Sequence, residues 1–244
     1  MTDRRGVTLI EVLVAVTLLS MVSVGMLMAM RVGLNAMGRT NEHITASRRV
    51  LGVERVLTQQ IAGFVPSTGL CAGGPEGASP APFAFFQGEL QTVRFVTTYS
   101  LEEASRGYPR IVEFHVVQGE NGRGVRLIVN ETIYTGPLST GAYCLGMVPD
   151  PQVGTAVVAW RPPAVNERSF VLADKLASCQ FGFKEEREFP QPDLWHARWT
   201  KDFTPSAIRV DLAPLEPEPG RLQVPSVIAP FRVTRHPFSQ YSDW

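Results

Sequence analysis

The chain has 244 residues, with 23 basic and 23 acidic side chains, so its bulk charge gives no reason to expect a nucleic acid partner. This length allows one or two domains and a substantial hydrophobic core. Hydrophobic residues make up 44% of the chain, which is ordinary for a globular protein, but they are concentrated before Arg31. This uneven distribution separates an apolar N-terminal segment from a remainder of ordinary composition.

The segment from Val12 to Met30 contains no charged residue. As an α-helix it would be roughly 28 Å long, close to the hydrocarbon thickness of a bilayer. Thr17, Ser20 and Ser23 fit this interpretation, because their hydroxyl groups can donate to backbone carbonyls of the preceding turn. A buried core helix rarely stays apolar on every face for so long. The segment therefore predicts a transmembrane helix.

A cleaved secretory signal peptide is the main competing interpretation, because its apolar part also follows basic residues. Here the apolar run is longer than usual, no small-x-small cleavage site precedes Arg31, and Glu11 lies at the head of the run. A carboxylate at the centre of a membrane helix costs about 2.5 to 3.5 kcal/mol, and less near the interface. Glu11 therefore needs either a partner or a hydrated position.

The residues around Glu11 read RRGVTLIEVLVAVTLL. This stretch resembles the class III signal of type IV pilins and of the pseudopilins of type II secretion systems: a short basic leader, Gly, and then Phe-Thr-Leu-Ile-Glu. Val7 departs from the pattern, which most often has Phe at that place. The resemblance implies that prepilin peptidase cuts after Gly6 and methylates the new N-terminal amine of Val7. Residues 1–6 would then be a leader peptide, and Glu11 would be the fifth residue of the mature chain.

In this interpretation, Glu11 of one subunit neutralises the N-terminal amine of a neighbour when subunits stack into a filament. Opposite charges gain most by pairing where the dielectric is low, and a charge left alone there is costly. Glu11 would thus set the register between adjacent helices. Its position alone also allows a second interpretation, in which Glu11 stays hydrated near the headgroups and has no role in assembly.

The resemblance also implies a location and an orientation. The chain would cross the bacterial inner membrane once, through residues 7–30, with its short N-terminus cytoplasmic before cleavage and its C-terminal domain periplasmic. Basic residues flank both ends of the apolar run, so the positive-inside rule alone does not decide the orientation. The cleavage motif decides it.

A helical pattern continues over residues 31–65, where apolar positions recur at steps of three and four. The stripe consists of His43, Ala46, Val50, Val53, Leu57, Ile61 and Phe64. Pro66 would end the helix. This segment is predicted to be an amphipathic continuation of the membrane helix.

Residues 66–90 are rich in Gly, Pro, Ala and Ser and are predicted to form a long loop. Asn121 and Gly122 suit a hairpin turn. The predicted fold class is α+β and pilin-like, with the long helix packed on antiparallel sheets. An antiparallel β domain in the periplasm is expected over 66–213, with a linker and C-terminal tail over 214–244. Strand patterns occur at 91–99, 111–117, 126–130, 155–160, 178–184, 207–212 and 226–234.

Residues 176–212 resemble the C-terminal part of the J-type minor pseudopilins of type II secretion. In that family a strand ending in an aromatic residue is followed by an acidic loop, one or two Trp, and a Leu-Pro-x-Ala-Val-x-Val strand. Thr204 replaces the usual Leu, and Gln60 stands near the helix end where Asp is common. Core packing is the expected role of Trp195 and Trp199. The matching features are Phe181, Phe183, Trp195, Trp199 and the stretch TPSAIRVDL.

This resemblance implies a structural, non-enzymatic subunit at or near the tip of the pseudopilus, which supports protein export across the outer membrane. Its partners would be the I-, K- and H-type minor pseudopilins, the major pseudopilin, prepilin peptidase, the inner-membrane assembly platform and membrane lipid. A minor pilin of a type IV pilus shares the leader and the helix and is the first alternative. A membrane-anchored periplasmic enzyme or binding module is the second, and it would need convergent polar groups.

The three cysteines, Cys71, Cys144 and Cys179, include no C-x-x-C pair, which argues against a zinc ribbon or a thioredoxin-like motif. Cys71 and Cys144 lie in Gly-rich stretches of a domain expected in the periplasm, where disulfides persist. They are the favoured pair, with all three pairings open. Cys179 lies in a strand pattern and is expected to be a core residue.

No catalytic residue, metal or cofactor is expected. The acidic run at 185–188, together with Asp193, could hold calcium but lacks the spacing of a calcium-binding loop. A solvated loop is the better interpretation of that run. The histidines are scattered and form no H-x-x-x-H motif; they are His43, His115, His196 and His236.

Overall fold

The computed structural model describes residues 8–71, 80–151, 153–216, 226–234 and 236–238, without the side chains of 35–36 and 38–50. Its elements are α1 (Leu9–Ala62), β1 (Thr68–Cys71), β2 (Ala81–Ala84), β3 (Gln87–Glu89), β4 (Thr92–Ser100), β5 (Ser105–Gln118), η1 (Glu120–Gly122), β6 (Val125–Ile133), η2 (Pro137–Tyr143), β7 (Cys144–Pro149), β8 (Ala156–Trp160), β9 (Phe170–Glu185), β10 (Leu194–His196), β11 (Ala207–Pro214) and β12 (Val227–Pro230). This is the α+β, pilin-like class expected from the sequence.

The chain divides into two compact units between Arg49 and Val50, within α1. The last turns of α1 belong to the second unit and pack on its sheet. Val53, Leu57 and Ile61 are buried there at a spacing of four residues, which confirms this part of the predicted stripe. The helix ends at Ala62, ahead of Pro66.

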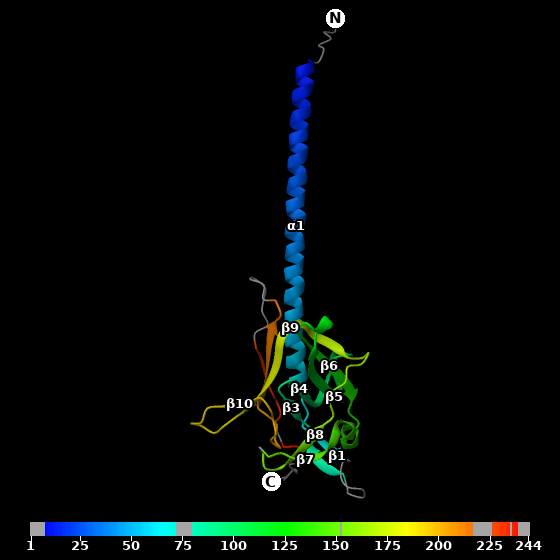
Figure 1. The fold of residues 1–244 in the computed structure, drawn as a ribbon, viewed down its shortest axis with the longest axis vertical. Helices are drawn as coiled ribbons and strands as arrows, with labels where there is room; N and C mark the ends of the chain where they lie inside the picture. Colours follow the sequence, from blue (N-terminus) through cyan, green and yellow to red (C-terminus); the bar gives the residue numbers. More distant parts are fainter. Residues whose placement is uncertain (1–7, 72–79, 152, 217–225, 235, 239–244) are drawn as a thin grey trace. The chain divides into compact units, whose positions relative to one another are not determined.

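The main sheet has the strand order β12-β11-β9-β6-β5-β4-β3, and β10 pairs with β9 in addition (Figure 1). Its pairings are antiparallel. Strand β9 has 16 residues and serves three neighbours. Its first part pairs with β6, its second part with β11, and its C-terminal end also with β10. The expected strands are therefore confirmed, although β5 and β9 are longer than their patterns suggested.

Side chains alternate between the faces of this sheet, so each face has its own core. On β4, Phe95 belongs to the larger core, which includes Leu57 and Ile61 of α1 and Phe181 of β9. Val96, the next residue, belongs to a smaller core with Phe85 and the two cysteines of the disulfide. The two-stranded sheets β1–β2 and β7–β8 contribute to this second core.

The prediction of a long loop over 66–90 is wrong, because β1, β2 and β3 lie in this segment. Each is only three or four residues long, and each is held by pairing with another part of the chain. Tertiary contacts here override a composition that is typical of loops. The sheet also extends beyond residue 213, since β12 forms its edge, as the strand pattern at 226–234 predicted.

The connection between β5 and β6 is the turn that the sequence predicts. Asn121 and Gly122 both have positive φ, 56° and 72°, a conformation that Asn and Gly adopt more readily than other residues. Gln118 and Val125 are paired directly beyond this turn. The two residues therefore set the register of the β5–β6 hairpin.

Candidate functional site

Glu11 lies in the first turn of α1. The carbonyl oxygen of Thr8 accepts hydrogen bonds from the backbone N–H groups of Glu11 and Val12, at 3.1 and 3.3 Å. A carboxylate in this turn is favoured by the partial positive charge of the helix N-terminus. Thr8 and Glu11 also have the T-x-x-E spacing of a capping box, a helix-start signal that the sequence analysis missed.

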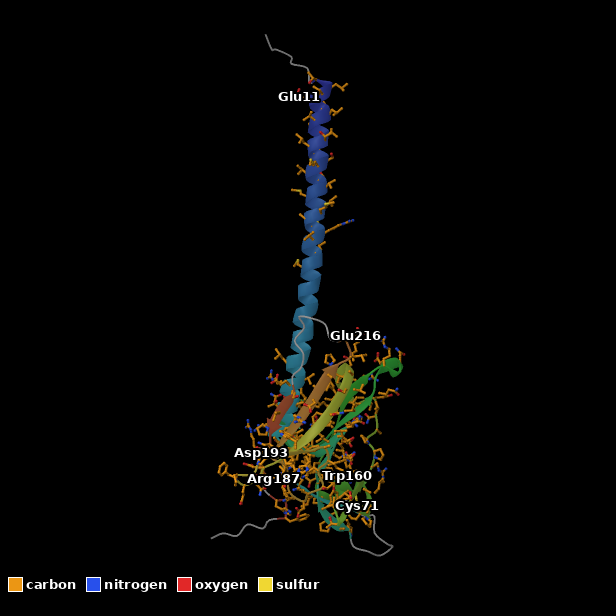
Figure 2. The ribbon with its side chains drawn as sticks, turned by 60° about the vertical axis from the view of Figure 1, so that its left-hand side comes forward. Glu11, Cys71, Trp160, Arg187, Asp193 and Glu216 are labelled. Atoms are coloured by element: carbon orange, nitrogen blue, oxygen red, sulfur yellow. A yellow bond between two sulfur atoms is a disulfide. The ribbon has the colours of Figure 1, made fainter. Side chains whose placement is uncertain are left out.

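The helical segment that carries Glu11 does not bury its carboxylate. All side chains from residue 8 to residue 34 are exposed (Figure 2). The hydroxyl groups are satisfied within the helix, since Thr17, Ser20 and Ser23 each donate to a backbone carbonyl at 2.8 or 2.9 Å. Glu11 is thus the one charged side chain between Gly6 and Met30.

The apolar part of α1 has the length and composition of a membrane span. It covers Leu9–Leu34, 26 residues with a mean hydropathy of 2.4, and none of its most apolar window is buried within the protein. This lack of burial distinguishes it from the core helix of a soluble protein. The segment is suited to anchoring the chain in a membrane.

Gly6 and Val7, the predicted cleavage site and the predicted methylated residue, lie outside the described residues. Residues 1–27 match the family model described as the Prokaryotic N-terminal methylation motif. The match spans the predicted leader, Glu11 and most of the apolar helix, and it indicates a type IV pilin-like or pseudopilin-like protein. No curated protein and no solved structure matches the chain.

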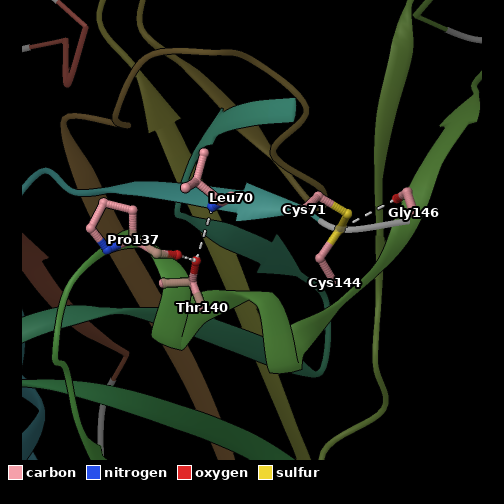
Figure 3. The surroundings of a disulfide bond; sticks show 6 residues. All are labelled: Leu70, Cys71, Pro137, Thr140, Cys144 and Gly146. Carbon is pink, nitrogen blue, oxygen red and sulfur yellow. Dashed lines mark hydrogen bonds between the residues drawn. A yellow bond between two sulfur atoms is a disulfide. The ribbon is translucent and has the colours of Figure 1, made fainter. Parts of the chain in front are cut away.

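A disulfide joins Cys71, at the end of β1, to Cys144, at the start of β7 (Figure 3). The neighbouring segments are also linked by hydrogen bonds. The hydroxyl of Thr140 donates to the carbonyl of Pro137 at 2.6 Å and accepts from the backbone N–H of Leu70 at 3.3 Å. The disulfide and Thr140 together hold β1, η2 and β7 against one another.

The second core contains a buried ionic cluster that sequence reasoning missed. Arg94 on β4 is 1% exposed and donates through Nε to the Glu113 carboxylate on β5, at 2.6 Å. The same guanidinium donates to the side chain of Gln87 and to the carbonyl of Arg161. The signal was present, because Arg94 and Glu113 each interrupt an apolar strand pattern.

The guanidinium of Arg94 also lies over two aromatic rings. Its Cζ is 4.8 Å from the ring centroid of Tyr143 and 5.4 Å from that of Trp160. The interior of the domain thus surrounds this cation with its own carboxylate, carbonyl and aromatic groups. Such an arrangement stabilises a buried charge and orders the packing of η2 and β8 on the sheet.

The histidines whose side chains are described do not form a common site. His115 is buried on β5, and both of its ring nitrogens lack a hydrogen-bond partner in the described part of the chain. His196 contacts Glu185 at 2.6 Å, and His236 lies 3.6 Å from Asp202. Among the described residues, no group of three or more His, Cys, Asp or Glu side chains is placed to hold a metal ion.

Trp199 and Cys179 are buried in the larger core, as expected. Burial, and secondarily the charge of Asp211, raises the pKa of the Cys179 thiol to about 12, so this cysteine is protonated and unreactive at neutral pH. Trp195 is only half buried and stacks under Arg209, whose Cζ is 4.8 Å from its ring centroid. The expectation of core packing thus holds for Trp199 but not fully for Trp195.

Proposed function

We propose that the chain is a structural minor pseudopilin of a type II secretion system, with no enzymatic role. Prepilin peptidase cleaves it after Gly6 and methylates Val7, and the mature chain assembles at or near the tip of the pseudopilus. In this location the chain is anchored in the bacterial inner membrane with its C-terminal domain in the periplasm, and it supports protein export across the outer membrane.

The observation that carries this proposal is the position of Glu11. It lies in the first turn of an exposed apolar helix, within a match to the N-terminal methylation motif that covers residues 1–27. Cleavage after Gly6 would leave a positive amine one helical turn before this carboxylate. In the membrane, Glu11 of one subunit then neutralises the N-terminal amine of the next. A shift of one helix along its neighbour that leaves either charge unpaired costs free energy.

The secretion-type subunit is supported by residues 176–212, which resemble the J-type minor pseudopilins. Phe181 and Phe183 lie on β9 and are buried in the larger core, which also contains Leu57 and Ile61 of α1. Trp199 packs into the same core, and β11 follows as the strand beside β9. The proposed partners are the I-, K- and H-type minor pseudopilins, the major pseudopilin and the inner-membrane assembly platform.

Mass spectrometry of the chain made with and without prepilin peptidase tests the processing step. We expect a mature chain that begins at N-methyl-Val7 when the peptidase is present, and a full-length chain when it is absent. An intact N-terminus in cells that process other prepilins would overturn the proposal, as would cleavage near Arg31.

Deletion of the gene in its own host separates secretion from the type IV pilus alternative. A secretion subunit should be needed for enzymes that appear in the culture medium, and surface pili should be unaffected. Loss of pili with normal export would instead identify the chain as a minor pilin. Complementation with the unaltered gene is the control for both measurements.

A further inference from the structure

The connection between β9 and β10, residues 186–193, projects from the body of the domain (Figure 1). Phe189 lies on this connection, which we call the tip loop, and its side chain is 96% exposed. No other large hydrophobic side chain in the described part of the chain has a larger exposed fraction. Burying this ring in a partner would be favourable, because its apolar surface would leave water.

The base of the tip loop is held at both ends by polar contacts. Glu185, the last residue of β9, accepts hydrogen bonds from His196 on β10 and from Lys201. In addition, Lys184 Nζ lies 2.7 Å from the carboxylate of Asp193. These contacts order the ends of the loop before any partner binds, which lowers the entropy lost on association.

The charged side chains of the tip loop indicate which kind of partner surface it could bind. Glu186 and Glu188 are exposed on either side of Arg187, whose guanidinium lies 4.0 Å from Glu185 at the base of the loop. The tip thus presents a phenyl ring next to carboxylates. These carboxylates would be repelled by an anionic lipid surface, whereas they match a protein cleft with basic side chains at its rim.

We propose that Phe189 is an anchor that inserts into an apolar, basic-rimmed cleft on a neighbouring pilin-like subunit of the same filament. This inference rests on the proposed function and adds a second contact to the one made by Glu11. The membrane helices set the register of the subunits, and the tip loop selects which exported domain lies beside this one. At protein interfaces a few well-buried side chains carry most of the binding energy, and Phe189 would be one of them.

Site-specific photocrosslinking tests this contact in the full chain, produced in its own host. Phe189 is replaced by p-benzoylphenylalanine, and Tyr108, which is 84% exposed on β5, is replaced in the same way as the matched control. We expect position 189 to give an adduct with another subunit that carries a prepilin-type N-terminal signal. The adduct should weaken when Glu186→Lys and Glu188→Lys are introduced together. Adducts with lipid only, adducts with a protein that lacks this signal, or no adduct would each overturn the inference.

A substitution series gives an independent measure. Phe189→Ser should reduce recovery of the chain with its filament neighbours by roughly tenfold or more, as for loss of an interface hot spot. Phe189→Leu should keep most of that recovery because it stays apolar, and Tyr108→Ser should have no effect. Equal recovery of Phe189→Ser and the unaltered chain would contradict the anchor.

The N-terminal mass of the same samples separates the two proposals. A chain that starts at Val7 but shows no contact through Phe189 retains the proposed function and loses the tip-loop anchor. A chain that keeps its leader in cells that process other prepilins loses both.

Discussion

Arg94 and Glu113 are directly opposite each other on β4 and β5, and their side chains form an ion pair in the interior of the domain. Asn130 on β6 donates to the other oxygen of Glu113 at 3.3 Å, so the carboxylate is bonded from both sides. Each charge of the pair therefore has partners in the interior. Removing one of the two residues would leave the other charge buried and unpaired, which lowers the free energy of unfolding.

Replacement of Arg94 by Met should lower the free energy of unfolding by about 3 to 5 kcal/mol, because Glu113 is left buried without its counter-charge. The double variant Arg94→Met/Glu113→Leu should be less destabilised than Arg94→Met alone. Denaturant unfolding of the full chain in detergent, followed by tryptophan fluorescence, measures both. A double variant that is the less stable of the two would contradict this account of the cluster.

Loss of the disulfide should destabilise the second core. Cys71 and Cys144 are separated by 73 residues, and a cross-link over a loop of this length is worth about 4 kcal/mol in the chain-entropy description. The double variant Cys71→Ala/Cys144→Ala should therefore unfold at a clearly lower denaturant concentration. Adding a reducing agent should shift the unaltered chain toward this variant and leave the variant where it is. Coincident unfolding curves before reduction would show that the cross-link contributes nothing.

Mild acidification should weaken the domain through His115. Burial, opposed by Glu113 and assisted by Arg94, lowers the pKa of His115 below its usual 6.5, so the unfolded chain binds the proton more readily. The stability linked to neutral His115 is complete above pH 6.5 and is lost as the pH falls from there toward the lower folded-state pKa. His115→Leu should flatten this part of the stability profile. An unchanged slope in this variant would assign the pH effect to other groups.

Glu11→Ala should leave the C-terminal domain folded, because Glu11 lies in the unit that ends at Arg49 and the sheet and its cores belong to the unit that begins at Val50. If the chain assembles as proposed, incorporation into the filament should fall sharply, since the N-terminal amine of a neighbour would then have no counter-charge in the membrane. Glu11→Asp, which keeps the charge on a shorter side chain, is the matched control and should retain part of the incorporation. Normal incorporation of the Ala variant would support the interpretation in which Glu11 is only hydrated at the headgroups.

The membrane-type helix and the long strands of the main sheet could be predicted because their signals are local. Nineteen uncharged residues from Val12 to Met30, and alternating apolar residues on β4 to β6, each indicate their structure within a short window. Asn121 and Gly122 specify their turn in the same way. Periodicity and turn chemistry were sufficient for these elements.

The short elements could not be predicted, because they depend on contacts made by residues distant in sequence. Strand β1 is held by β2 and by a disulfide to residue 144, and β10 by its pairing with β9. The partners of Arg94 come from β3, β5 and the segment after β8, so their meeting point depends on the whole fold. Glu11 could be singled out because the membrane makes an isolated charge conspicuous.

Strand β9 makes the unfolding of the main sheet cooperative. Detaching it would leave β11 paired with β12 alone and would turn β6 into an edge strand, so both halves of the sheet would lose the strand that joins them. Denaturation of the unit that begins at Val50 should therefore be close to all-or-none, and amide protons on both sides of β9 should exchange with solvent at similar rates.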